Sequence, residues 1–195
     1  RYMYVIGASI LTVYDVSNPV VPVLVGSVST GDVSFPSFIF VQGQYAYMVN
    51  GTMLGIFNVS NPAAPAYAGS VTIGATPQSV YVQGAYAYVA SLSARTLIII
   101  DVSNPKAPVQ VGSVITDSGI GPRYAFVQGR YAYVANNNDD TLSIIDVGNP
   151  KNPVPVGSVS TGASSDPYAI YVQGRYAYVV NSGTSTLSIF DVSNP

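Results

Sequence analysis

Apolar and polar residues alternate with a period of two through most of the chain. The alternating stretches are short, and turn residues such as Gly, Pro and Asn separate them. The clearest stretch, residues 86–90, reads Tyr-Ala-Tyr-Val-Ala. A period of two places successive side chains on opposite faces of a strand, whereas an amphipathic helix needs an apolar residue every three or four positions. The pattern therefore predicts an all-β protein.

The alternating pattern recurs along the whole chain as a Tyr-x-Tyr element. The element starts at Tyr2, Tyr45, Tyr86, Tyr131 and Tyr176, which are 41 to 45 residues apart. Repeats of this length, built from short apolar stretches with turns between them, are typical of a β-propeller, in which each repeat makes one four-stranded blade. We expect a single propeller domain over residues 1–195, or a fragment of one, with about five blades' worth of repeats.

Each repeat predicts four antiparallel strands. The inner strand begins at a proline and precedes Gln-Gly, at residues 36–41, 77–82, 122–127 and 167–172. The glycine supplies the positive φ of a hairpin turn, and Tyr-Ala-Tyr-Val forms the second strand. The third strand is rich in β-branched residues, at 11–15, 54–58, 97–101, 142–146 and 187–191. After a Ser-Asn-Pro turn, the outer strand ends in Val-Gly-Ser-Val or a close variant.

An acidic residue recurs at the end of the third strand. It is Asp15, Asp101, Asp146 or Asp191, and Asn58 takes its place in the second repeat. Such side chains bond nearby backbone amides, so we interpret them as structural caps of the Ser-Asn-Pro turn. A ring of carboxylates around the propeller axis would require them on the inner strand instead.

These motifs resemble the LVIVD-repeat family of bacterial and archaeal β-propellers. The third strand followed by Asp-Val-Ser-Asn-Pro-x-x-Pro, with Gly-x-Tyr-Ala-Tyr-Val upstream, carries the resemblance, which recurs five times over all 195 residues. Two repeats depart from the pattern, with Asn58 in place of Asp and Gly148 in place of Ser. The resemblance implies a secreted or cell-surface propeller, and it brings no catalytic residues.

The predicted strands do not divide into whole blades. The chain opens at a second strand and closes after a third, so one inner and one outer strand are missing. Two interpretations remain open: further blades lie outside this chain, which we favour, or the end strands pair with each other or with a neighbouring molecule. Bare strand edges would otherwise template aggregation.

Charge is scarce on this chain. Asp, Lys and Arg make up 8% of the residues, against about 25% in a typical domain. We therefore expect self-association or a covering of glycan. Asn50-Gly51-Thr52 and Asn58-Val59-Ser60 fit the N-glycosylation acceptor pattern, and the first is the better candidate. The seven basic residues are scattered, which disfavours nucleic acid, and no apolar run approaches the roughly 20 residues of a membrane span.

The residues that usually carry chemistry are nearly absent. The chain has no His, Cys or Glu, so no Ser has a His partner to activate it. We predict no enzyme activity, no catalytic residue and no cofactor. Residues 136–140 offer oxygen ligands on a loop, with Asp139 and Asp140 as calcium candidates. This loop lacks the glycine bend and the closing bidentate Glu of a calcium loop, so a solvated hairpin loop is the preferred interpretation.

The loops of the predicted propeller differ between its two faces. The Gln-Gly and Ser-Asn-Pro turns are nearly invariant, whereas the middle hairpin loops and the connections between blades vary. Function on a rigid scaffold is usually carried by variable loops, so we predict that any binding uses this face. The candidate residues are Asn50, Arg95, Asp117, Asn137, Asp139 and Asp166. Most of the 16 tyrosines recur at fixed strand positions, which indicates packing between blades rather than carbohydrate stacking.

Two functions from different classes fit these observations. The first is a non-catalytic propeller, extracellular or at the cell surface, that acts as a structural, adhesive or interaction module. Its partner would be another protein or further copies of itself, in an oligomer or filament. The alternative is part of an enzyme or cofactor-binding propeller whose catalytic residues lie outside this chain, because a propeller fold does not determine function.

Overall fold

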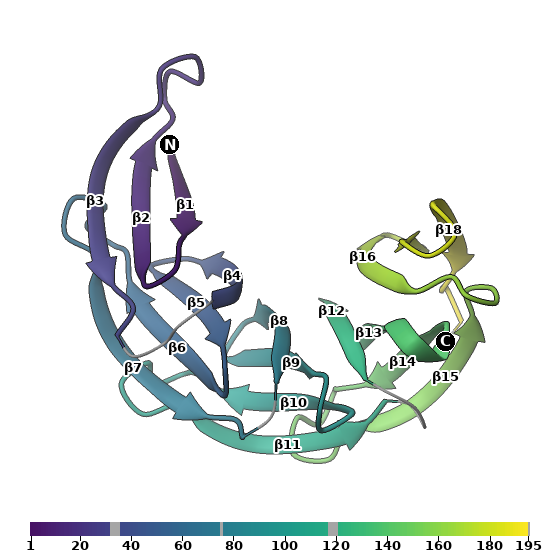
Figure 1. Cartoon of the computed structure of the whole chain (residues 1–195). Helices are drawn as coiled ribbons and strands as arrows, with labels where there is room; N and C mark the ends of the chain where they lie inside the picture. The colour runs from purple at the N-terminus through teal and green to yellow at the C-terminus, as the bar shows by residue number, and fades with distance from the viewer. Residues whose placement is uncertain (32–35, 75, 117–120, 195) are drawn as a thin grey trace.

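The computed structural model describes residues 1–31, 36–74, 76–116 and 121–194 of the chain. These residues form five antiparallel sheets, arranged side by side as the blades of an open arc (Figure 1). The prediction of an all-β propeller is confirmed. In this part of the chain, no helix is long and apolar enough to cross a membrane.

The blades follow one another in chain order. Blade 1 holds β1 (Tyr2–Ile6), β2 (Ile10–Asp15) and β3 (Val23–Ser29). Blade 2 holds β4 (Pro36–Gln42), β5 (Tyr45–Asn50), β6 (Met53–Asn58) and β7 (Ala66–Thr72). Blade 3 holds β8 (Pro77–Gln83), β9 (Tyr86–Ser91), β10 (Thr96–Asp101) and β11 (Val109–Ile115). Blade 4 holds β12 (Pro122–Gln128), β13 (Tyr131–Asn136), the 3-10 turn η1 (Asn137–Asp139), β14 (Thr141–Asp146) and β15 (Val154–Ser160). Blade 5 holds β16 (Pro167–Gln173), β17 (Tyr176–Asn181) and β18 (Thr186–Asp191).

Neighbouring strands of each blade are neighbours in sequence. The inner strands β4, β8, β12 and β16 line the concave side of the arc, and the outer strands β3, β7, β11 and β15 line its convex side (Figure 1). Blade 1 starts with a second strand and blade 5 stops after a third, as the strand count predicts. The predicted bounds of the inner strands are each one residue too short, because the Gln before the turn still pairs with the next strand.

The Gln-Gly turns between the first and second strands have the predicted geometry. Gly43, Gly84, Gly129 and Gly174 have φ between 60 and 62°. This is the left-handed region, where a side chain is strained and glycine is not. The turn therefore brings the chain back as a hairpin and places the Tyr-Ala-Tyr-Val strand beside the inner one.

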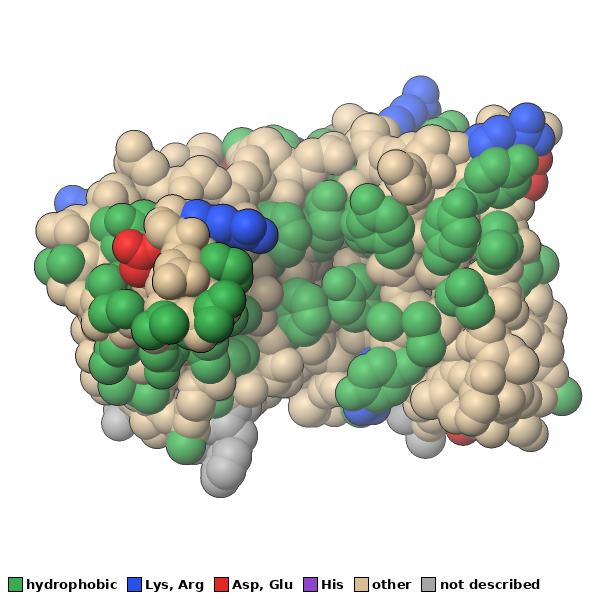
Figure 2. Space-filling model, turned by 90° about the horizontal axis from the view of Figure 1, so that it is seen from above, with side chains coloured by type: hydrophobic (Ala, Val, Ile, Leu, Met, Phe, Trp, Pro, Cys, Tyr) green, Lys and Arg blue, Asp and Glu red, His purple; other side chains and the backbone are tan. Residues whose placement is uncertain are grey.

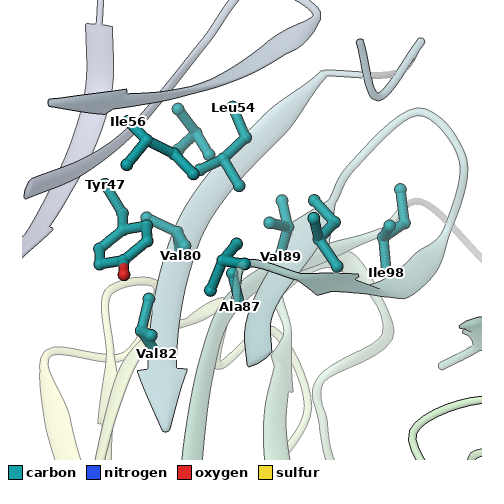
Figure 3. Packing of buried hydrophobic residues seen from close by; sticks show 11 residues of the cluster. Tyr47, Leu54, Ile56, Val80, Val82, Ala87, Val89 and Ile98 are labelled. Carbon is teal, nitrogen blue, oxygen red and sulfur yellow. The ribbon is translucent and has the colours of Figure 1, made fainter. Parts of the chain in front are cut away.

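The hydrophobic core lies between the blades. We call the side of a blade that is turned toward the next blade its front face, and the opposite side its back face. The front face of blade 2 packs Tyr47, Val49, Leu54 and Ile56 against the back face of blade 3, which includes Val80, Val82, Ala87, Val89 and Ile98 (Figure 3). Burial of each large aliphatic side chain stabilises the fold by about 1.5–3 kcal/mol. Equivalent clusters join blades 1 and 2, 3 and 4, and 4 and 5.

The glycine of the outer strand lets consecutive blades approach closely. A Cβ atom at Gly69 would lie 2.4 Å from the carbonyl oxygen of Pro105, and one at Gly112 would lie 2.2 Å from that of Pro150. Both carbonyls belong to the Asn-Pro turn of the following blade. The Val-Gly-Ser-Val motif therefore has a packing reason that the sequence pattern alone does not reveal, since a side chain there would push the blades apart.

Candidate binding surfaces

The middle hairpin loops and the connections between blades meet on one face of the molecule. The amide of Leu92 donates to the carbonyl of Thr76 over 2.9 Å, and that of Ser182 donates to the carbonyl of Asp166 over 3.1 Å. Each bond joins a hairpin loop to the connection that precedes the same blade. We call this side the variable-loop face.

The loop residues proposed for binding have different environments. Arg95 is exposed and has a positive φ of 57°. Asn137 is half-buried, and its Nδ2 donates to the carbonyl of Pro167 over 3.4 Å. Asp139 and Asp166 are also half-buried on this face. Asp117 lies outside the described residues.

The proposal of Asn50 as an exposed binding residue is wrong. Asn50 ends β5 and is only 2% exposed. Its counterparts Asn136 and Asn181 are equally buried, and the Asn136 Nδ2 donates to the carbonyl of Thr116 and to the hydroxyls of Thr141 and Ser143. Asn136 and Asn181 thus brace the ends of their second strands, the latter through bonds from its Nδ2 to the hydroxyls of Thr186 and Ser188. Burial also removes Asn50 as an accessible acceptor for N-glycosylation.

Asp140 holds a neighbouring loop in place. Its carboxylate accepts the amides of Ser164 and Asp166, at 2.6 and 2.9 Å, and the hydroxyl of Ser165 at 3.1 Å. The bond from the amide of Asp166, followed by that from Ser164, lowers the pKa of Asp140. Among the described residues, no group of three or more acidic side chains comes together that could hold a metal ion. The geometry of Asp140 is that of a loop brace, because hydrogen-bond donors occupy the carboxylate that calcium would need.

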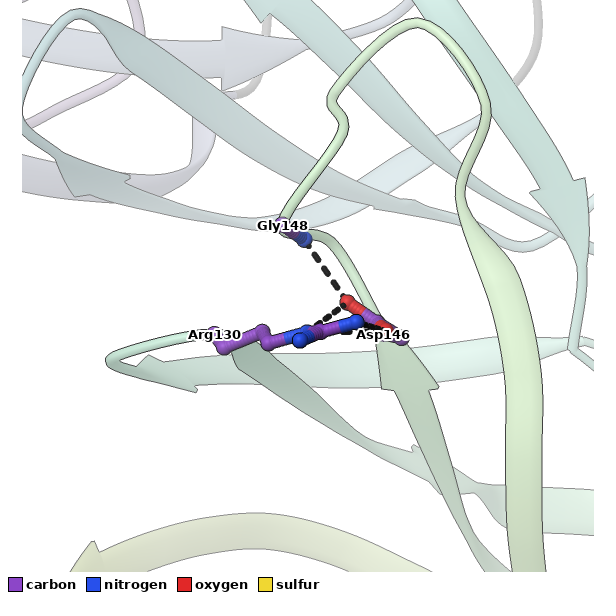
Figure 4. A network of polar contacts seen from close by, with 3 residues as sticks. All are labelled: Arg130, Asp146 and Gly148. Atoms are coloured by element: carbon purple, nitrogen blue, oxygen red, sulfur yellow. Dashed lines mark hydrogen bonds and ion pairs between the residues drawn. The ribbon is translucent and has the colours of Figure 1, made fainter.

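The acidic residues at the Ser-Asn-Pro turns accept the backbone amide two residues further along the chain. Asp15, Asp101, Asp146 and Asp191 do so at 2.8 to 3.0 Å, and Asn58 does so at 2.9 Å. Arg130 adds a bidentate ion pair to Asp146, with Nε 2.9 Å from both carboxylate oxygens (Figure 4). Arg175 forms an ion pair with Asp191 through its Nη2. Hydrogen bonds from Arg130 and the amide of Gly148 lower the pKa of Asp146.

The inner strands carry a feature that the sequence analysis missed. Each has a β-bulge at its second residue, which is Ser37, Gln78, Arg123 or Tyr168. In β12, for example, Pro122 pairs with Asn136 and Tyr124 pairs with Ala135, so Arg123 is left without a partner in the ladder. A bulge redirects a side chain that a regular strand would send to the other face of the sheet.

The bulges direct these side chains into a hollow on the concave side of the arc. The hollow measures about 380 Å³ and is lined by Ser37, Phe38, Gln78, Arg123, Tyr124, Tyr168 and Ala169. It lies where the inner strands begin, at the variable-loop face, and we call it the axial hollow. The guanidinium carbon of Arg123 lies 4.3 Å from the ring centroid of Tyr168. Phe38 and Tyr124 meet edge to face, with centroids 5.4 Å apart.

A row of aromatic rings in tilted or edge-to-face contact lies further along the inner strands. Phe40, Tyr81, Phe126 and Tyr171 follow one another from blade to blade, with centroid distances of 4.7 to 5.3 Å. Beyond this row, the Gln83 Nε2 donates to the carbonyl of Gly129 and the Gln128 Nε2 donates to that of Gly174, both at 2.8 Å. These contacts fix the inner strands relative to one another and hence fix the shape of the axial hollow.

The two ends of the arc expose faces that are buried between the other blades. Val180, Leu187 and Ile189 on the front face of blade 5 are 48, 59 and 58% exposed, whereas their counterparts Val49, Leu54 and Ile56 in blade 2 are all 0% exposed. On the back face of blade 1, Met3 and Val5 are 42 and 39% exposed. Figure 2 shows hydrophobic side chains over both arms of the arc and in the space between them, with few charged side chains among them.

The fold and the repeated contacts between blades define the class of this protein, which is a β-propeller. The model of the LVIVD repeat family matches residues 1–30, 36–73, 74–116, 125–161 and 166–195. These matches cover most of the chain, so the protein belongs to the LVIVD-repeat family. No curated protein matches it in sequence.

Several solved structures share the fold at low sequence identity. A protein from Lactobacillus plantarum has a TM-score of 0.83 and 17% identity, over 97% of this chain and 63% of that one. The periplasmic gluconolactonase of Pseudomonas aeruginosa has a TM-score of 0.79 and 17% identity, over 96% and 61%. A functionally unknown protein from Desulfotomaculum acetoxidans has a TM-score of 0.77 and 17% identity, over 97% and 65%. The chain thus spans less than two thirds of each structure, and the likeness concerns the fold alone.

Proposed function

We propose that this protein is a non-catalytic interaction module, extracellular or at the cell surface, and that the end faces of the arc accept a further blade of the same repeat. In a solution of this 195-residue chain, a second copy supplies that blade. The observation that carries the proposal is the exposure of Val180, Leu187 and Ile189 on blade 5. An exposed apolar patch of this kind marks an interaction site.

The interfaces between consecutive blades indicate which surface fits the exposed front face of blade 5. Four times along the chain, a front face with this residue pattern packs on the back face of the following blade. Blade 1 presents such a back face through Met3 and Val5. The front face of blade 5 in one copy therefore has its complement on blade 1 of a second copy. A contact between two different surfaces is heterologous and builds a ring or a filament.

Composition supports a non-catalytic role and association between copies. The chain carries no His, Cys or Glu, and only 8% of its residues are charged. Low charge weakens the repulsion that keeps protein molecules apart in solution, which favours assembly.

The test is the mass of the chain in solution, by light scattering across a wide range of concentration and by electron microscopy. We expect the mass to rise with concentration and the variant with both Leu187→Lys and Ile189→Lys to stay monomeric, because two desolvated charges would face the partner. Ile115→Lys is the matched control, since Ile115 is 65% exposed on the outer strand β11. A parent that is monomeric at every concentration would refute the proposal.

A mixing experiment tests the head-to-tail arrangement. The double variant keeps a free back face on blade 1, and a Met3→Lys variant keeps a free front face on blade 5. Each alone should be monomeric, and the two together should form a dimer of one copy each. Recovery of no dimer, or association of either variant with itself, would contradict the arrangement.

A further inference from the structure

The axial hollow is a site that the proposed assembly does not use. It lies on the concave side, where β4, β8, β12 and β16 begin, and not on the end faces. Its volume of about 380 Å³ falls within the usual range of small-molecule sites. Side chains from four blades converge there because every inner strand has a bulge at the same position.

Arg123 gives the axial hollow its charge. It is the sole charged residue among the four at the bulges, and the others are Ser37, Gln78 and Tyr168. Arg130 and Arg175 are each engaged by a carboxylate, whereas Arg123 has no carboxylate within 4 Å in the described part of the chain. Its guanidinium instead stacks on Tyr168. Stacking on the ring fixes the orientation of the planar guanidinium. Its N–H donors lie in the guanidinium plane and stay able to bind a carboxylate with two hydrogen bonds.

The remaining lining combines rings with neutral polar groups. Phe38 and Tyr124 offer apolar surface, and Ser37 and Gln78 offer a hydroxyl and an amide. The Ser37 hydroxyl is held by the carbonyls of Val49 and Pro77, at 3.2 and 3.0 Å. Burial raises the pKa of Tyr124, so its phenol stays protonated and can donate a hydrogen bond.

From this combination we infer that the axial hollow binds a hexuronic acid, a six-membered sugar ring with one carboxylate. The carboxylate pairs with Arg123, and the C–H face of the ring lies on the aromatic side chains. The sugar hydroxyls pair with Gln78 and Tyr124. A purely aromatic carboxylate would leave these polar groups without partners, which costs binding free energy.

The inference is tested by titrating the 195-residue chain with glucuronate and galacturonate, by calorimetry and by NMR. Glucose, galactose and benzoate are the comparison ligands. We expect saturable binding of at least one uronate and binding at least about tenfold weaker for the comparison ligands. The neutral sugars lack the charge-assisted pair with Arg123, which contributes about 1.5–3 kcal/mol. Benzoate keeps that pair but leaves Gln78 and Tyr124 without partners, at a cost of about 1–3 kcal/mol for each buried group.

The chain offers matched variants for this test. Arg123→Gln introduces the residue that β8 carries at the same position, and Tyr168→Ser introduces that of β4, so both should melt like the parent. Each should weaken uronate binding, Arg123→Gln by about tenfold or more. Arg130→Gln also removes one positive charge, at a turn of the opposite face, where blade 2 carries Gln44, and it should bind like the parent.

Three results would overturn the inference. The first is no saturable binding of either uronate. The second is an equal loss in Arg123→Gln and Arg130→Gln, which would indicate attraction to net charge rather than to a site. The third is benzoate binding as tightly as the uronates, which would assign the axial hollow to aromatic acids instead of sugars.

Discussion

The acidic caps of the Ser-Asn-Pro turns contribute stability that depends on pH. Bonds from the hydroxyl and then the amide of Ser103 lower the pKa of Asp101, so the folded state binds a proton less readily than the unfolded chain. A lowered pKa stabilises the fold above the unfolded value of about 4, and this stabilisation is lost as the pH falls through the folded value. The pKa values of Asp15, Asp146 and Asp191 are lowered as well.

Asn58 supplies the natural control for this effect, because it caps the same turn of blade 2 with a side chain that does not titrate. We predict that Asp101→Asn melts close to the parent at pH 7 and loses less stability than the parent between about pH 4 and pH 2. Thermal unfolding followed by circular dichroism, at pH 7 and across this acid range, measures the melting temperature of each variant and its loss of stability with falling pH. Asp101→Ala should melt lower at pH 7, since it removes the cap itself. Identical acid profiles for parent and Asp101→Asn would contradict the prediction.

Some single-residue features could be predicted from the sequence and others could not. The caps and the turn glycines are predictable because their geometry depends on residues two or three positions away. The burial of Asn50 and of its counterpart Asn136 could not be predicted in this way. The amide of Asn136, for example, donates to the carbonyl of Thr116, which lies in the connection between blades 3 and 4. A signal for the axial hollow did exist: the residue after the inner-strand proline is different in all four inner strands, as Ser37, Gln78, Arg123 and Tyr168.

At the scale of the strand, the alternation of apolar and polar residues was sufficient to predict the order of the strands and their approximate bounds. It did not predict the register in which neighbouring strands pair. The bulges in the inner strands are visible only when Pro122 and Tyr124 are matched to their partners in β13. A second bulge falls in the outer strands, as between Ile99 and Ile100 where β10 pairs with β11. Register is set by contacts between strands and between blades, so a single-strand pattern could not reveal which side chains reach the concave side.

The contact between an outer strand and the next blade gives a prediction at this scale. Gly112→Ala should destabilise the fold by about 1–3 kcal/mol, because its Cβ would lie 2.2 Å from the carbonyl oxygen of Pro150 and the two blades would have to separate. Ser113 lies on the same strand with its side chain exposed, so Ser113→Ala serves as the control and should change the free energy of unfolding by less than about 0.5 kcal/mol. Urea unfolding of both variants measures the difference. Equal midpoints would show that the blades are not held at this contact.

The molecule as a whole is a row of blades in which each blade contacts mainly its neighbours. In such arrays the stability is close to a sum of terms for each repeat and each interface, so a repeat with one interface is less stable than a repeat with two. Blades 2, 3 and 4 have a packed blade on both sides, whereas blade 5 packs on blade 4 and exposes its other face. The third strand shows the contrast: β10 is buried at its four central positions, and β18 is mostly exposed.

We therefore predict a gradient of hydrogen-exchange protection along the arc. At matched strand positions, the amides of β9 and β10 should exchange at least about tenfold more slowly than those of β17 and β18, because exchange reports local opening free energy. The comparison controls for sequence, since both pairs of strands follow the same repeat. Assembly through the end faces would give blade 5 a second interface, so the gradient should flatten as the protein concentration rises. The Leu187→Lys and Ile189→Lys double variant should keep a steep gradient at every concentration. Uniform protection in that monomeric variant would show that the blades unfold as one unit and that the end faces add no local stability.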